Sequence, residues 1–185
     1  MERHLFKGFV ALAGLAAALF TSAGSERDLA TAPGQKRGGS TNATALPGTN
    51  THSAEAWKLM EEYFAALRKD GVGRANDLVP QILLKGTNDW ELMNFLSWRI
   101  FADRNVRHRD RGLALTAAQR AVQLKGEKDP NVLDTYARAL FESGKHEQAI
   151  ETERKAVQLC TAEAQRIEME ANLNRYVRLS KQLKR

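Results

Sequence analysis

Residues 132–159 have the sequence VLDTYARALFESGKHEQAIETERKAVQL, in which small and large apolar residues recur every three or four positions. Such spacing places these residues on one face of an α-helix. Gly144 interrupts the pattern near its middle, and a glycine there is typical of a turn that ends one helix. The stretch therefore predicts two antiparallel helices that pack against each other.

The same pattern occurs 35 residues earlier, where ALTAAQRAVQL (114–124) aligns with AIETERKAVQL (149–159). Alanine at matched places lets two helix backbones approach closely without a loss of helix propensity. We therefore expect two successive hairpins of similar structure. The residues expected to pack the helices together are Trp98, Ala102, Ala114, Ala121, Leu133, Tyr136, Ala137, Leu140, Gly144, Ala149 and Ala156, with Phe101, Leu115, Leu124, Ile150 and Leu159 filling the grooves.

The composition favours helix over sheet in most of the chain. Of the 185 residues 43% are apolar and 27% charged, which is typical of a globular domain, and only 7% are aromatic. Asp129 followed by Pro130 is typical of a helix start, and Asn88 followed by Glu91 has the spacing of a capping box. Helices are predicted at residues 53–69, 77–85, 89–103, 111–124, 130–143, 146–160 and 162–183.

The first 23 residues have the order of a secretory signal peptide. A basic segment, MERHLFK, precedes an uncharged apolar run at residues 8–20, and small residues follow at Thr21 and Ala23. Cleavage after Ala23 is predicted, which indicates an exported, periplasmic protein. The alternative is an uncleaved membrane anchor, although the run is shorter than the about 20 residues that span a bilayer. Residues 24–52, rich in Gly, Ser, Thr and Pro, are expected to form a flexible linker.

The chain has a single cysteine, Cys160, so an internal disulfide is excluded. The stability of the folded chain must therefore come from packed side chains. We expect Cys160 to be a small apolar residue near a helix end. A disulfide between two chains is the alternative.

Residues 131–164 resemble a tetratricopeptide repeat, because Leu133, Tyr136, Ala137, Leu140, Gly144, Ala149 and Ala156 stand where that family places its packing residues. Residues 96–130 resemble it less closely, and residues 53–86 match it poorly, as a degenerate N-terminal hairpin. The sequence departs from the family pattern at Glu153 and Ala118, where an aromatic residue is preferred. Residues 162–185 keep Ile167 and Ala171 as the first helix of a third repeat, with no second helix after it.

The expected fold is therefore all-α, with antiparallel helical hairpins stacked as a short solenoid of the tetratricopeptide kind and a C-terminal capping helix. Residues 53–86 form the degenerate hairpin in this scheme, and residues 87–185 form the repeats with their cap. The latter part is also similar to helical C-terminal segments of exported bacterial thioredoxin-like proteins. No thioredoxin domain or Cys-x-x-Cys motif is present, so no redox activity is implied.

The tetratricopeptide resemblance implies that a peptide or partner protein is held on the concave surface that the first helix of each hairpin forms. The family's best-known carboxylate clamp pairs a lysine or arginine with an asparagine one turn later, whereas Arg99 is followed by Asp103. The alternative is that the polar residues there are ordinary solvated surface. The residues predicted to contact the partner are Arg99, Asp103, Asn131, Asp134 and Arg138.

Two basic segments account for much of the net charge of +6. RNVRHRDR (104–111) aligns with a hairpin turn and lacks neighbouring aromatic platforms, so we expect a solvated turn and no binding to nucleic acid. The second segment, in the last predicted helix, either complements the helix dipole or forms a docking face for an acidic partner or an anionic surface. Its basic residues recur at helical spacing and are Arg175, Arg178, Lys181 and Arg185. Contact with a membrane is expected only through this face or through an uncleaved N-terminal segment.

No residue pattern indicates catalysis. The four histidines are scattered, Cys160 has no partner cysteine for a zinc site, and Ser143 lies near His146 in a polar turn without an oriented base. We expect no enzyme, no cofactor and no metal. The predicted function is that of an exported protein-interaction module or accessory subunit that binds a peptide or a partner protein. The alternative is a structural domain that docks on an envelope complex through its basic C-terminal helix.

Overall fold

The structure, a computed structural model, describes residues 52–69 and 71–184, which all belong to one compact unit, Ala45–Arg185. The predicted signal peptide and nearly all of the predicted linker lie outside the described residues. Every regular element within them is a helix, so the all-α prediction is confirmed. The helices are α2 (Ala54–Lys69), α3 (Val72–Gly86), α4 (Trp90–Ala102), α5 (Arg111–Lys125), α6 (Pro130–Glu142), α7 (His146–Leu159) and α8 (Glu163–Leu183).

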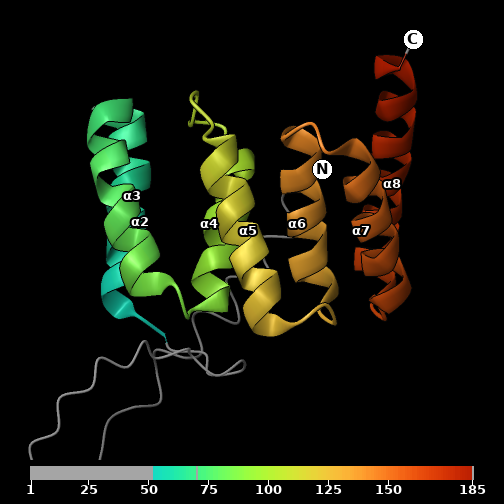
Figure 1. Cartoon of the computed structure of the whole chain (residues 1–185), viewed down its shortest axis with the longest axis horizontal. Helices are drawn as coiled ribbons and strands as arrows, with labels where there is room; N and C mark the ends of the chain where they lie inside the picture. The colour runs from blue at the N-terminus through green and yellow to red at the C-terminus, as the bar shows by residue number, and fades with distance from the viewer. Residues whose placement is uncertain (1–51, 70, 185) are drawn as a thin grey trace, which may run out of the picture. The chain divides into compact units, whose positions relative to one another are not determined.

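Six of these helices form three hairpins, α2–α3, α4–α5 and α6–α7, and α8 follows as a single helix (Figure 1). We call α2, α4, α6 and α8 the first helices, and α3, α5 and α7 the second helices. α4 contacts α6, and α5 and α7 each pack against the first helix that follows. The hairpins thus stack in chain order, as predicted. The turns within the hairpins lie at one end of the helices, together with the end of α8 (Figure 1).

Five of the six alanines predicted to pack the repeat lie where helices meet, whereas Ala102 is partly exposed. Their burial confirms that small side chains are placed at the contacts between helices. Leu133 and Leu140, which pack beside them, are each 2% exposed, and Tyr136 is partly buried against the same core. Gly144 lies in the α6–α7 turn with φ of 80°, a conformation that favours glycine. The predicted packing alanines with no exposed surface are Ala114, Ala121, Ala137, Ala149 and Ala156.

The second helix of the first hairpin begins earlier than predicted. α3 starts at Val72 rather than at residue 77, because Gly71 adopts φ of 83° and turns the chain directly after α2. Pro80 consequently lies inside α3, on its exposed side. A proline inside a helix removes one backbone hydrogen bond, and the predicted helix at residues 77–85 had Pro80 near its start.

Two other expectations are wrong. α4 is capped by Asp89, whose Oδ1 accepts a hydrogen bond from the Leu92 amide at 3.0 Å, and not by Asn88. Leu159 is 37% exposed instead of filling a groove, because it is the last residue of α7, where the chain leaves the helix. Asp129 caps α6 with Pro130 in its first turn, as predicted.

Cys160 lies directly after α7 and is 6% exposed. Its sulfur lies 3.5 Å from the carbonyl oxygen of Ala162, within the connection to α8. The thiol is thus a buried apolar group at a helix end, as expected. A disulfide to a second chain would require this connection to open first.

Gly86 ends α3 where the helix comes close to both α2 and α4. A Cβ atom on this residue would lie 2.8 Å from Cδ2 of Leu92 and 3.3 Å from Cβ of Ala56. We expect Gly86→Ala to lower the free energy of unfolding by about 1–3 kcal/mol through overpacking. Urea denaturation followed by circular dichroism measures this change.

Gly73→Ala is the matched control, because a Cβ atom on Gly73, also within α3, would meet nothing within 4 Å. This substitution should be neutral or slightly stabilising. Equal losses in the two variants would show that close packing at Gly86 is not the cause.

Candidate functional site

A row of aromatic rings crosses the first helices α2 and α4. The ring centroid of Trp57 lies 5.6 Å from that of His52 and 5.6 Å from that of Phe95, and Phe95 lies 5.6 Å from Trp98. Trp57, Phe95 and Trp98 are each partly exposed. We call these four residues the aromatic row.

The side of α4 that reaches solvent is largely apolar. Phe95, Trp98 and Ala102 follow one another at helical spacing on this side, and all three are partly exposed. A helix at the surface of a soluble protein normally presents polar residues to water. Trp98 and Ala102 were predicted as packing residues, and they are only partly buried. Phe95 was not predicted, although its spacing to Trp98 and Ala102 is a signal that the sequence contains.

Arg99 and Asp103, two of the predicted partner-binding residues, link α4 to α2. The guanidinium group of Arg99 pairs with Glu61 and lies 4.3 Å from the ring centroid of Phe64. Oδ2 of Asp103 accepts a hydrogen bond from Arg68 at 3.0 Å and lies 3.9 Å from Nε of Arg99. The side chains of Arg99 and Asp103 are 16% and 12% exposed. Most of the surface of both side chains is therefore buried in the contact between α2 and α4.

Asn131 lies in the first turn of α6 and is partly exposed. Its amide donates a hydrogen bond to Oδ1 of Asp129 at 3.0 Å, and its carbonyl accepts one from the hydroxyl of Thr135 at 3.1 Å. Asn131 precedes Asp134 by three residues, which places both on the same side of α6.

Asp134 and Arg138 lie further along α6 and contact neighbouring hairpins. Oδ1 of Asp134 accepts a hydrogen bond from Nδ2 of Asn172 on α8 at 3.0 Å. Arg138 donates one to the carbonyl of Phe101 on α4 at 3.2 Å. Burial raises the pKa of Asp134 and lowers that of Arg138. The structure thus divides the predicted residues into two groups, one between α2 and α4 and the other between α6 and its neighbours.

A second carboxyl group lies beside Asp134. Glu153 on α7 has no exposed surface, and neither of its oxygens accepts a hydrogen bond from a described donor. Burial, with a smaller contribution from Asp134, raises the pKa of Glu153 to about 10. Glu153 is therefore neutral at pH 7.

Tyr176 of α8 packs close to the two carboxyl groups. Its side chain is 1% exposed, and its ring stacks on Phe141 with centroids 4.5 Å apart. Burial, followed by the charges of Asp134 and Glu153, raises the pKa of its hydroxyl. We call Asp134, Glu153, Asn172 and Tyr176 the carboxyl cluster. In the sequence, Glu153 stands out only as a departure from the family pattern. That departure is the one feature that could have indicated a buried carboxyl group.

The predicted basic residues of the last helix are exposed. Arg175, Arg178 and Lys181 reach solvent on α8, whereas Arg185 lies outside the described residues. The guanidinium group of Arg175 lies 5.3 Å from the ring centroid of Tyr176. Beyond them, Nζ of Lys184 lies 2.7 Å from a carboxylate oxygen of Glu147, which joins the end of α8 to the start of α7.

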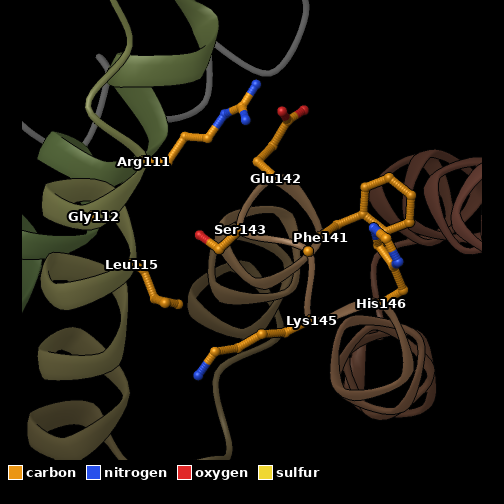
Figure 2. Close-up of a pocket in the computed structure, with 9 residues that line it drawn as sticks. Arg111, Gly112, Leu115, Phe141, Glu142, Ser143, Lys145 and His146 are labelled. Carbon is orange, nitrogen blue, oxygen red and sulfur yellow. The ribbon is translucent and has the colours of Figure 1, made fainter.

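A recess of about 680 Å³ opens between α5 and the α6–α7 turn. Figure 2 shows Arg111 and Leu115 on the α5 side, facing Glu142 at the end of α6 and Ser143 and Lys145 of the turn. The rings of Phe141 and His146 lie together on the far side of the turn, with centroids 4.8 Å apart. The lining combines the basic side chains of Arg111 and Lys145 and the acidic side chain of Glu142 with two apolar side chains, those of Leu115 and Phe141.

Three potential metal ligands, His52, Asp89 and Glu91, lie with their ligand atoms within 4.8 Å of one another. Asp89 is fully buried, and its oxygens already accept hydrogen bonds from the Leu92 amide at 3.0 Å and from the indole of Trp57 at 2.9 Å. A metal ion would have to compete with these bonds. The geometry therefore supports a helix cap that also fixes the start of α2 to α4.

None of the described helices combines the length and apolarity needed to cross a bilayer. Comparison with protein-family models, with curated proteins and with solved structures gave no significant match. The resemblance to tetratricopeptide repeats thus depends on the residues of the chain itself and stays a prediction.

Proposed function

We propose that the chain is a non-catalytic, exported protein-interaction module or accessory subunit of tetratricopeptide type, which binds a peptide or a partner protein on its first helices. The observation that carries this proposal is the partly exposed apolar side of α4, formed by Phe95, Trp98 and Ala102. Contiguous apolar surface on a soluble protein marks interaction sites. We expect the partner to contact these three residues directly.

The surroundings of the aromatic row support a binding role. Tryptophan and arginine are enriched among the residues that contribute most to protein interfaces. Arg99 lies 5.9 Å from the ring centroid of Phe95 and is held by its pair with Glu61. A side chain that is already fixed loses little conformational entropy when a partner binds. Trp98 and Arg99 are therefore the two anchors that we assign to this surface.

Ala102→Arg is expected to weaken partner binding by about tenfold or more, because a long charged side chain would cover the apolar side of α4. Arginine at this position, near the end of a helix, is compatible with the helix dipole. The partner is first captured from an envelope extract and identified by mass spectrometry. Its affinity for the purified wild type and variant is then measured by isothermal titration calorimetry.

Gln148→Arg introduces the same side chain at an exposed position on the second helix α7 and is the matched control. It should leave the affinity unchanged, and circular dichroism should show native helix content for both variants. A partner that binds Ala102→Arg as tightly as the wild type would place the site away from the first helices and contradict the proposal.

A further inference from the structure

The fold brings together two basic segments that are far apart in the sequence. The arginine-rich residues 104–110 connect α4 to α5, and the basic side chains of α8 continue to its last turn. Because the helices alternate in direction, the α4–α5 connection and the end of α8 lie at the same end of the unit (Figure 1). The sequence alone predicts a solvated turn for the first segment and a helix end or a docking face for the second.

The two ends of the helices differ in charge. Each end comprises the described residues of its connections and the six helical residues next to them. The end that holds the hairpin turns has thirteen basic and six acidic residues, whereas the opposite end has eight of each. The excess of basic residues in the unit thus lies at one end. We call it the basic end, and its basic residues are Arg68, Lys69, Arg74, Arg99, Arg104, Arg107, Arg109, Arg111, Arg138, Lys145, Arg178, Lys181 and Lys184.

Contacts between neighbouring elements make the basic end continuous. Arg68 at the end of α2 donates a hydrogen bond to Asp103 at the start of the α4–α5 connection. Arg111 and Lys145 line opposite sides of the recess shown in Figure 2. The pair between Lys184 and Glu147 then joins α8 to α7.

The basic end also carries exposed apolar surface. Leu183, in the last turn of α8, is 67% exposed and lies between Lys181 and Lys184. Arg107, Lys145 and Lys181 are exposed on three separate elements. The cations are therefore distributed over several turns and do not line one groove.

We propose that the basic end binds the surface of a membrane that contains anionic lipids. Lipid head groups present negative charge over an area, which matches cations spread across several hairpin turns. Basic residues near such a surface each contribute to binding, and an exposed leucine among them can enter the boundary between head groups and acyl chains. An acidic peptide would instead need a defined groove, and the recess at this end contains Glu142, which opposes a second negative charge. The exposed cations Arg107, Lys145 and Lys181 lie outside the proposed partner surface on α4.

The test measures binding of the full chain to vesicles by sedimentation. Vesicles of phosphatidylcholine with about 30 mol% phosphatidylglycerol are compared with vesicles of phosphatidylcholine alone. We expect binding to the anionic vesicles that weakens as salt is raised, since the attraction is between exposed charges. An apolar N-terminal segment that inserts into lipid would bind both kinds of vesicle and carries basic residues of its own, so the loss of binding on charge reversal within the basic end isolates the contribution of that end.

The triple variant Arg107→Glu, Lys145→Glu and Lys181→Glu should lower the affinity for anionic vesicles at least about 100-fold. The control variant Lys58→Glu, Lys128→Glu and Arg154→Glu makes the same change in net charge at exposed residues outside the basic end. It should bind within a few-fold of the wild type. If the triple variant does not fold, Lys181→Glu alone should weaken binding about fivefold.

Three results would overturn the proposal. One is equal binding to both kinds of vesicle, and another is an equal loss in the two triple variants. The third is binding to soluble polyglutamate without binding to anionic vesicles, which would assign the basic end to an acidic protein.

Discussion

Glu153→Gln is expected to raise the unfolding temperature above pH 7 and to remove most of the decline in stability toward alkaline pH. Burial holds the pKa of Glu153 at about 10, above the ordinary value of 4.5, so the folded chain keeps a proton that the unfolded chain releases. Stability is therefore fully present below pH about 4.5 and is lost as the pH rises through the folded pKa. One such proton contributes up to about 1.4 kcal/mol per pH unit.

Glutamine has nearly the same shape as glutamic acid and does not titrate. Its amide group can donate a hydrogen bond to Asp134, which otherwise faces the neutral carboxyl group of Glu153. The other charged and titratable groups that act on Glu153 or Asp134 are Arg138 of α6 and Arg175 and Tyr176 of α8. All of these groups remain in the variant, so a difference in the pH dependence of stability is due to the one proton of Glu153.

Thermal unfolding followed by circular dichroism between about pH 5 and pH 9 measures this effect. Glu151→Gln is the control, because Glu151 lies on the same helix α7, is exposed, and undergoes the same chemical substitution without a buried carboxyl group. The control should leave the slope of stability against pH unchanged. Parallel slopes for the wild type and Glu153→Gln would show that the buried carboxyl group does not control the pH dependence.

Ala137→Leu is expected to lower the free energy of unfolding by about 1–3 kcal/mol. Ala137 has no exposed surface, and it lies on α6, which packs closely against α7. The extra carbon atoms would force the two helices apart or push side chains out of their preferred rotamers. Urea denaturation gives the free energy directly.

Ala171→Leu provides a control at the corresponding place in α8. Ala171 is exposed on α8. The same substitution should therefore change the free energy of unfolding by less than about 0.5 kcal/mol. A large loss at Ala171 as well would mean that leucine is disfavoured for a reason other than the contact between helices.

Much of the fold was predictable because local signals agreed with one another. The repeated alanines placed the contacts between helices, and Asp129 with Pro130 placed the start of α6 at the observed residue. The first hairpin was less predictable, because Pro80 disfavours a helix at its position. The turn at Gly71 and the packing of α3 against α2 nevertheless stabilise α3. Tertiary contacts override such local preferences.

The candidate site was less predictable than the fold. The sequence identified Arg99, Asp103, Asp134 and Arg138 as polar residues on first helices, but not the neighbours that engage them. The bond from Arg68 to Asp103 joins residues 35 apart, and that from Asn172 to Asp134 joins residues 38 apart. Such partners are fixed only when hairpins stack. The same holds for the basic end, whose basic residues come from six helices and the connections next to them.

The burial of Cys160 makes its reactivity a natural reporter of motion. The thiol is the only one in the chain and is enclosed in the connection between α7 and α8. A maleimide can reach the sulfur only while that connection is open, so its rate of labelling counts the openings. Detachment of the last helix can thus be timed in the unmodified protein, without an introduced dye or a second cysteine.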